Sequence, residues 1–204
     1  MNLSEIVNNN CTDKNTRHSY LDVYQNLMGS KKDSAKFILE IGVENGGSIK
    51  LWKDFFQNAT VYGLDIMNIE DRFANETSQE IQRTLREINE DSRVKLFTSY
   101  NAYDESLFNK TFLNQDKLFD FMIDDGPHTL ESMCFFVNYY SKLLADDGVL
   151  IIEDIQAHDW LNILMLATPE VLRKYIKTFD LRHIKDRYDD ILFVIDKRPE
   201  IKYG

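Results

Sequence analysis

Short apolar runs recur along the chain, and each is closed by a glycine or an acidic or polar residue. Five of them are expected to be strands, over residues 37–41, 59–64, 94–97, 119–123 and 148–152. Helix-length segments are expected over residues 48–56, 77–89, 130–144 and 161–174. Buried strands that alternate with helices predict a parallel sheet with helices on both faces.

The end of the chain departs from this alternation. Two further strands are expected around Tyr175–His183 and over Ile191–Asp196, joined by the short polar turn Lys185–Asp190. So short a connection favours an antiparallel hairpin at the sheet edge. The predicted fold class is therefore α/β, a Rossmann-like, doubly wound and mostly parallel seven-stranded sheet with a C-terminal antiparallel hairpin. His183 is expected to be a structural residue of the sixth strand.

Length and composition fit one domain. The 204 residues are 43% hydrophobic, enough for one sizeable core. We expect residues 36–204 to form this domain and residues 1–35 to form a polar segment in front of it. With 24 basic and 34 acidic residues, the net charge is −10. A field of this sign repels phosphate backbones and anionic lipid, so neither nucleic acid nor a membrane is an expected partner.

Two cysteines do not make a disulfide framework, and the first residues lack the pattern of a signal peptide. No apolar stretch approaches the ~20 residues that span a bilayer. A soluble, cytoplasmic protein is the expectation. Its partner is expected to be a neutral or cationic small molecule.

Polar residues close all five of the first strands. In a parallel sheet, ligands bind outside the carboxyl ends of the strands, so these residues should face one crevice. They are Glu40 and Gly42, Asp65, Ser99 to Asn101, Asp124 and Asp125, and Glu153 and Asp154.

The segment from Glu40 to Ser48 is a strand end, a glycine turn and a helix start. Gly42 lets the backbone turn tightly against a ligand, and Ser48 could cap the helix. Glu44 stands where a dinucleotide-binding loop has its second glycine, which disfavours a pyrophosphate ligand and hence a dehydrogenase. Asp65, 23 positions after Gly42, could accept hydrogen bonds from both hydroxyls of a ribose. The alternatives are an ordinary turn and a capping or surface acid.

Four carboxylates close the fourth and fifth strands. Asp124, Asp125, Glu153 and Asp154 should repel one another unless protonated or bound to a cation, and such hard ligands select Mg²⁺, Mn²⁺ or Ca²⁺. Solvated acids that cap helices are the alternative. His128, three residues after Asp125, is a candidate general base.

Three further strings carry a family resemblance. They are Cys11-Thr-Asp-Lys-Asn-Thr-Arg-His-Ser-Tyr20, Asp124-Asp-Gly-Pro-His128 and Ile152-Glu-Asp-Ile155. Together with the Glu40 turn and Asp65, they resemble class I S-adenosylmethionine-dependent methyltransferases. The resemblance is to the metal-dependent macrolide deoxysugar O-methyltransferases of the mycinamicin type. In that pattern, Cys11 and Asn15 replace glycines and Pro127 replaces a serine.

The resemblance implies a role for each matching position. His128 would be the catalytic base, and Asp125, Glu153 and Asp154 would hold Mg²⁺ or Mn²⁺. The segment 1–35 would cover the cofactor and the substrate. The implied cofactor-binding residues are Lys14, Tyr20, Glu40, Gly42, Asn45, Ser48, Asp65, Ile66, Ser99, Tyr100, Asn101 and Asp124. The expected substrate-binding residues are His158, Tyr188 and Asp189.

The sequence thus predicts a Mg²⁺-dependent O-methyltransferase that acts on a hydroxyl of a deoxysugar in a glycoside or glycan. Two alternatives stay open. A catechol-type diol methyltransferase would use the same metal chemistry and accept aromatic substrates. A non-catalytic sugar- or nucleoside-binding domain would bind the cofactor without turnover. A homo-oligomer is compatible with all three.

Overall fold

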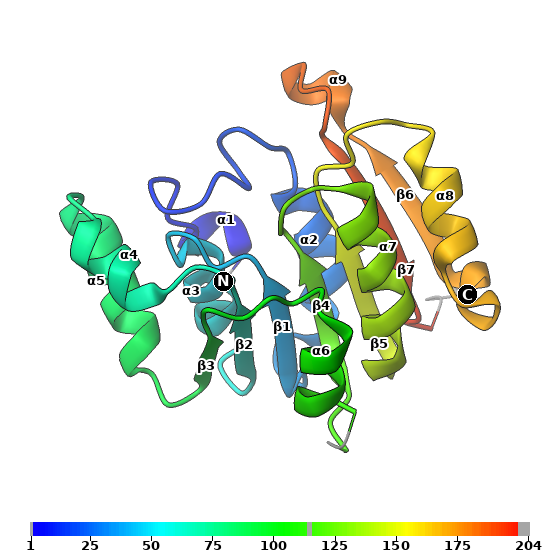
Figure 1. Ribbon diagram of the computed structural model, residues 1–204. Coiled ribbons are helices and arrows are strands. Elements are labelled where there is room, and N and C mark those ends of the chain that lie inside the picture. The colour runs from blue at the N-terminus through cyan, green and yellow to red at the C-terminus, as the bar shows by residue number, and fades with distance from the viewer. Residues whose placement is uncertain (1, 114–115, 200–204) are drawn as a thin grey trace.

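The computed structural model of the 204-residue chain describes residues 2–113 and 116–199 (Figure 1). Its centre is a seven-stranded sheet with strand order β3-β2-β1-β4-β5-β7-β6. The strands are β1 (Phe37–Ile41), β2 (Thr60–Leu64), β3 (Val94–Phe97), β4 (Phe119–Asp124), β5 (Leu144–Ile152), β6 (Ile176–Asp180) and β7 (Ile191–Asp196). The first five are parallel, and β7 runs antiparallel to both β5 and β6. The predicted fold class is confirmed.

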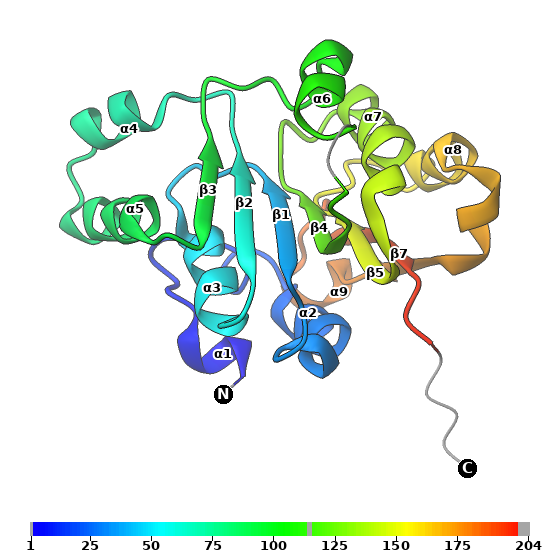
Figure 2. The same ribbon diagram turned by 90° about the horizontal axis from the view of Figure 1, so that it is seen from below.

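Helices cover both faces of this sheet (Figure 2). Successive strand residues alternate between two hydrophobic clusters, as Ile38 and Leu39 do, because side chains of a strand point to opposite faces. One cluster includes residues of α2, α3 and α5, and the other includes residues of α6, α7 and α8. The helices are α1 (Leu3–Ile6), α2 (Leu21–Met28), α3 (Gly47–Phe55), α4 (Ile69–Asn75), α5 (Gln79–Glu90), α6 (Glu105–Thr111), α7 (Leu130–Tyr139), α8 (Trp160–Ala167) and α9 (Arg182–Lys185). The described residues also form the 3₁₀ turns η1 (Gly29–Lys31), η2 (Tyr140–Leu143) and η3 (Glu170–Tyr175).

Side-chain caps fix where several helices begin. Asn68, Ser78, Asp104 and Thr129 each accept a backbone N–H of the first turn of α4, α5, α6 and α7. These caps satisfy amide groups that have no partner within the helix. Because the loops before α6 and α7 border the carboxyl ends of the strands, the caps also hold that edge in place.

Several predicted boundaries were wrong. The sixth strand stops at Asp180, and His183 lies in the short helix α9 rather than in a strand. The helix expected over 161–174 ends at Ala167, because Pro169 cannot continue it, and η3 follows. The strand β5 begins at Leu144, four residues before the expected start, and pairs across a register irregularity in β4.

The N-terminal segment packs on the sheet. Tyr20 and Tyr24 are fully buried, and α2 shares the cluster formed by α3 and the sheet. A Cβ on Gly47 would lie less than 3.0 Å from the main-chain oxygen of Cys11, so the segment crosses the start of α3 in direct backbone contact. Within the described residues, no helix is both long and apolar enough to cross a membrane.

Candidate active site

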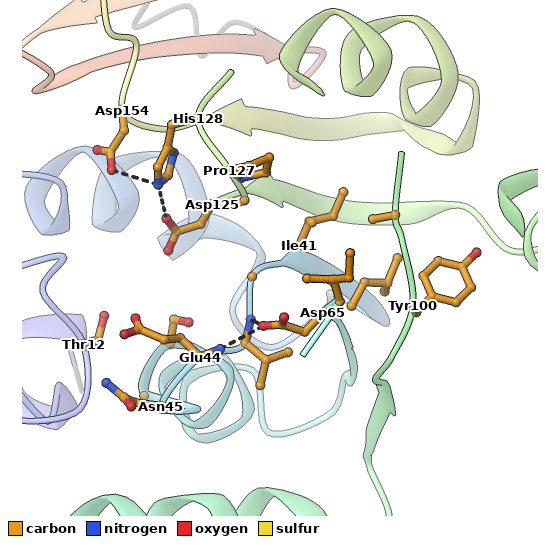
Figure 3. Close-up of a pocket in the computed structure, with 18 of the residues that line it drawn as sticks. Thr12, Ile41, Glu44, Asn45, Asp65, Tyr100, Asp125, Pro127, His128 and Asp154 are labelled. Atoms are coloured by element: carbon orange, nitrogen blue, oxygen red, sulfur yellow. Dashed lines mark hydrogen bonds and ion pairs between the residues drawn. The ribbon is translucent and has the colours of Figure 1, made fainter. Parts of the chain in front are cut away.

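A cavity of about 480 Å³ opens at the carboxyl ends of β1, β2, β4 and β5. That volume suits a ligand the size of a nucleoside cofactor. Figure 3 shows acidic side chains at both of its ends, Asp65 on one side and Asp125 with Asp154 on the other. Of the site residues predicted from the sequence, the cavity is lined by Gly42, Asn45, Ser48, Asp65, Ile66, Tyr100, Asn101, Asp125, His128 and Asp154.

Asp65 holds the turn after β1. Its Oδ2 accepts the backbone N–H groups of Val43 at 2.7 Å and Glu44 at 3.1 Å, and its Oδ1 accepts that of Met67 at 2.8 Å. A carboxylate has about four acceptor positions, so Oδ1 can still accept from a ligand hydroxyl. Ile66 beside it is 74% exposed and lines the cavity, which leaves an apolar surface open to a flat ring.

The opposite end of the cavity combines two carboxylates with an imidazole. His128 Nε2 lies 3.5 Å from Asp154 Oδ2 and 3.8 Å from Asp125 Oδ1 (Figure 3). Both His128 and Asp154 have left-handed backbones, with φ of 51° and 55°. Non-glycine residues rarely adopt this region, and the positions where they do cluster at functional sites. Burial raises the pKa of Asp154, although His18 opposes that rise.

A second acidic cluster lies behind the cavity wall and surrounds Lys14. The Lys14 Nζ atom lies 2.7 Å from Asp125 Oδ2, 2.6 and 2.8 Å from the two carboxylate oxygens of Glu153, and 3.3 Å from Glu40 Oε1. Burial raises the pKa of Glu40 to about 7 although Lys14 opposes that rise. Burial also raises the pKa of Glu153. Burial acts to lower the pKa of Lys14, but the neighbouring carboxylates outweigh it and raise that pKa well above its usual value.

Aromatic hydroxyls and a buried histidine hold the acids from the side of the N-terminal segment. Tyr20 donates to Asp154, and Tyr24 donates to Glu153. His18 Nδ1 is 2.7 Å from Asp190 Oδ1 and 3.3 Å from Asp154 Oδ1. Asp154 therefore has a fixed orientation before any ligand binds.

Asp124 is the last residue of β4. It is buried, and Tyr103 donates to its Oδ1. Burial raises the pKa of Asp124 to about 6. Asp124 is not among the residues that line the cavity, and its contacts support the loop that carries Asp125.

Other predicted site residues also lie off the cavity wall. Lys14, Tyr20, Glu40 and Glu153 are buried behind it, and Ser99 lies two residues after β3 with φ of 52°. The three expected substrate-binding residues are also absent from the residues that line the cavity. His158 is exposed before α8, Tyr188 is 63% exposed and donates to Gln156, and the main-chain oxygen of Asp189 accepts from Tyr20. Their roles stay predictions.

The sequence analysis did not single out several residues of the site. Thr12 and Asp13 line the cavity, His18 contacts Asp154, and Tyr24 and Tyr103 donate to the buried Glu153 and Asp124. The spacing of Tyr24, four residues after Tyr20, was one available indication, because residues four apart share a helix face. No local pattern pointed to Tyr103, which reaches Asp124 from a loop 21 residues earlier.

The donor set of the cavity fits a hard divalent cation. Asp125, His128 and Asp154 each offer one ligand atom, and these atoms lie within 4.8 Å of one another. Carboxylate oxygens are the ligands that Mg²⁺ and Mn²⁺ prefer. A second set, Glu40, Asp125 and Glu153, meets the same distance criterion, but Lys14 Nζ already lies among its oxygens.

No protein-family model matches the chain. Among curated proteins, it is 24% identical over 156 residues to the 8-demethyl-8-alpha-L-rhamnosyl tetracenomycin-C 2'-O-methyltransferase of Streptomyces olivaceus, covering 73% of this chain and 36% of that protein. It is 25% identical over 150 residues to the L-olivosyl-oleandolide 3-O-methyltransferase of Streptomyces antibioticus, covering 70% and 34%. The chain therefore spans about a third of the length of these relatives.

Solved structures share the fold at low identity. The MycE methyltransferase from the mycinamycin biosynthetic pathway, solved with Mg, SAH and mycinamycin VI, aligns with a TM-score of 0.69 at 18% identity, over 100% of this chain and 56% of that one. A putative rRNA methylase from Clostridium thermocellum aligns with a TM-score of 0.62 at 15% identity, over 88% and 96%. These likenesses establish the fold and leave the substrate to other arguments. The chain has the fold of class I S-adenosylmethionine-dependent methyltransferases, and its sequence resembles the O-methyltransferases that modify sugars of macrolides and related glycosides.

Proposed function

We propose that the protein is an S-adenosylmethionine-dependent O-methyltransferase whose acceptor is a sugar hydroxyl of a natural-product glycoside. A divalent cation, Mg²⁺ or Mn²⁺, would assist it. One observation carries the proposal: a single cavity joins Asp65 and Ile66 at one end to Asp125, His128 and Asp154 at the other. A methyl donor and an ion-bound acceptor could therefore meet within it.

The first end suits the nucleoside part of the donor. Asp65 Oδ1 would accept from the ribose, Ile66 would pack against the adenine, and the glycine turn would leave room for the methionine part. Asp13, Glu44, Asp125 and Asp154 give the cavity a negative field that favours a cationic sulfonium. When bound, S-adenosylmethionine supplies the activated methyl group.

The other end suits activation of the acceptor. Asp125 and Asp154 would hold the divalent ion, which when bound supplies Lewis-acid stabilisation of the developing alkoxide. His128 Nε2 would take the proton of the acceptor hydroxyl, and the neighbouring carboxylates would stabilise the resulting imidazolium. Glu153, expected as a third metal ligand, has both oxygens bonded by Lys14.

The substrate class rests on the curated relatives. Those proteins act, by their names, on a rhamnosyl tetracenomycin and an olivosyl oleandolide, and a third relative is the demethylmacrocin O-methyltransferase of Streptomyces fradiae, 25% identical over 167 residues. Residues 1–35 would complete the site as a covering segment of the 36–204 domain, because Thr12 and Asp13 reach the cavity. Segments beyond this chain in such relatives could add acceptor contacts.

An acceptor screen tests the proposal. The protein is incubated with S-adenosylmethionine and Mg²⁺ together with rhamnosides, olivosides, free sugars or catechols, and methylated products are detected by mass spectrometry. We expect transfer to a glycoside. Transfer to catechols alone would favour the diol alternative, and cofactor binding without any product would favour the non-catalytic one.

A further inference from the structure

The buried Lys14 contacts Asp125 and Glu153, two of the three metal ligands predicted from the sequence. We infer that its ammonium is the resident cation of the Glu40, Asp125 and Glu153 cluster. Glu153 then fixes Lys14, and a divalent ion is held by Asp125 and Asp154 beside His128. The inference rests on the proposed function, since it assigns the ligands of the proposed ion.

The position of Lys14 Nζ carries the first step. It lies within 3.3 Å of oxygens from all three carboxylates, and two of these distances, to Asp125 and Glu153, are 2.7 and 2.6 Å. Those are the lengths of strong charge-assisted hydrogen bonds. An ion bound by these three acids would need the space that the ammonium fills.

The second observation is that both carboxylate oxygens of Glu153 already accept hydrogen bonds. Lys14 donates to both of its oxygens, and Tyr24 donates to Oε1 as well. Glu153 is 2% exposed and is not among the residues that line the cavity. An ion in the cavity can therefore contact Asp125 and Asp154 directly, whereas Lys14 separates it from Glu153.

The segment that carries Lys14 is anchored on both sides, which opposes its withdrawal. Lys185 from α9 donates to the main-chain oxygens of Asn15 and His18, the latter at 2.6 Å. Tyr20 N–H donates to the main-chain oxygen of Lys14 at 3.1 Å. Lys14 is thus a positioning residue: it holds Asp125 by Oδ2 and leaves Oδ1 facing His128.

Mn²⁺ binding to matched carboxylate variants tests the inference. Calorimetric titration of the native protein should show one Mn²⁺ per chain. Glu153→Gln should weaken Mn²⁺ binding less than Asp154→Asn does, because Glu153 makes no bond to the ion and the amide oxygen of the variant can still accept from Lys14. Asp154→Asn should weaken the affinity by about tenfold or more. An equal loss in both variants would make Glu153 a ligand and would overturn the inference alone. A native protein that binds no Mn²⁺ would overturn the proposed ion site as well.

Two variants of Lys14 test the inference through the rise in melting temperature that Mn²⁺ produces. A purely structural role of Lys14 would leave that rise unchanged. Lys14→Met removes the ammonium and should lower the melting temperature. Mn²⁺ should raise it more in this variant than in the native protein, because the vacated carboxylates then attract the ion. Lys14→Arg, which keeps the charge, should respond to Mn²⁺ as the native protein does. An equal Mn²⁺ response in Lys14→Met and the native protein would contradict the inference. If Lys14→Met does not fold, the comparison of Glu153→Gln with Asp154→Asn decides.

Discussion

A Cβ on Gly42 would lie less than 3.0 Å from the main-chain oxygen of Asp125, so the loops after β1 and β4 meet backbone to backbone. This contact joins the Asp65 end of the cavity to the end that contains Asp125, His128 and Asp154. Gly42 also has φ of 98°, a conformation that favours glycine.

Gly42→Ala should therefore damage both stability and the site. The clash and the left-handed backbone together should cost roughly 2–4 kcal/mol of unfolding free energy. Urea denaturation measures this cost. Gly29→Ala is the control, because its Cβ would meet only the flexible side chain of Gln25, and its cost should be small. Equal stability of the two variants would contradict the assigned contact.

Asp65→Ala should weaken S-adenosylmethionine binding by about tenfold or more, since it removes charge-assisted hydrogen bonds worth roughly 1.5–3 kcal/mol. It also frees the Val43 and Glu44 amides that order the turn. Calorimetry on a folded variant measures the affinity. Asp91→Ala is a matched control, because Asp91 likewise accepts a nearby backbone N–H, from Arg93, but does not line the cavity. Unchanged affinity in Asp65→Ala would place the nucleoside elsewhere.

His128→Ala should lower turnover by about 10²–10⁴-fold while cofactor binding persists, because the variant loses the proton acceptor and keeps the Asp65 end. The measurement is methyl transfer under single-turnover conditions. His183→Ala provides the comparison, since this exposed side chain of α9 lies outside the residues that line the cavity. Near-native turnover in His128→Ala would require another base.

The pH dependence of stability should report Asp124. Burial raises its folded-state pKa from 3.8 to about 6. Between these values the unfolded chain has lost the proton and the folded chain retains it, so the free energy of unfolding falls as pH rises. Relative to Asp124→Asn, the native protein should lose roughly 1–3 kcal/mol from about pH 4 to pH 6, at about 1.4 kcal/mol per unit.

Asp120 on the same strand supplies the opposite sign for that experiment. Burial acts to raise the pKa of Asp120, but Lys31 and the amides of Lys36 and Phe37 outweigh it and lower that pKa. The stabilisation that ionised Asp120 adds to the free energy of unfolding should be present above about pH 4 and should be lost as the pH falls. Denaturation curves of Asp120→Asn and Asp124→Asn, recorded in chelator across this pH range, separate the pH-dependent contributions of Asp120 and Asp124 to the free energy of unfolding. Parallel pH profiles for native protein and Asp124→Asn would contradict the assigned burial effect.

The fold was largely predictable because apolar runs and their closing residues are local features. Strands β1, β3 and β7 begin and end where their patterns indicated. The start of β5 was not predictable in this way. Its first residues include Asp146, Asp147 and Gly148, a composition typical of a turn, yet they extend the strand beside an irregular stretch of β4.

The site was predictable where a residue directly closes a strand. Gly42, Asp65, Asp125 and Asp154 reach the cavity for that reason. The burial of Lys14 was not predictable, because lysine is almost never fully buried unless it is paired, and its partners lie as far as 139 residues away in the chain. Those pairings depend on the folded sheet and not on local sequence.

The central claim is that one cavity holds a methyl donor and an ion-assisted sugar acceptor. The most direct measurement is transfer of a labelled methyl group from S-adenosylmethionine to a rhamnoside, in Mg²⁺, in excess EDTA, and after Mn²⁺ is restored. We predict transfer in Mg²⁺, none in EDTA although the cofactor still binds, and recovery with Mn²⁺. Full transfer in EDTA would contradict the ion assignment, and Asp125 and Asp154 would then serve only to orient His128.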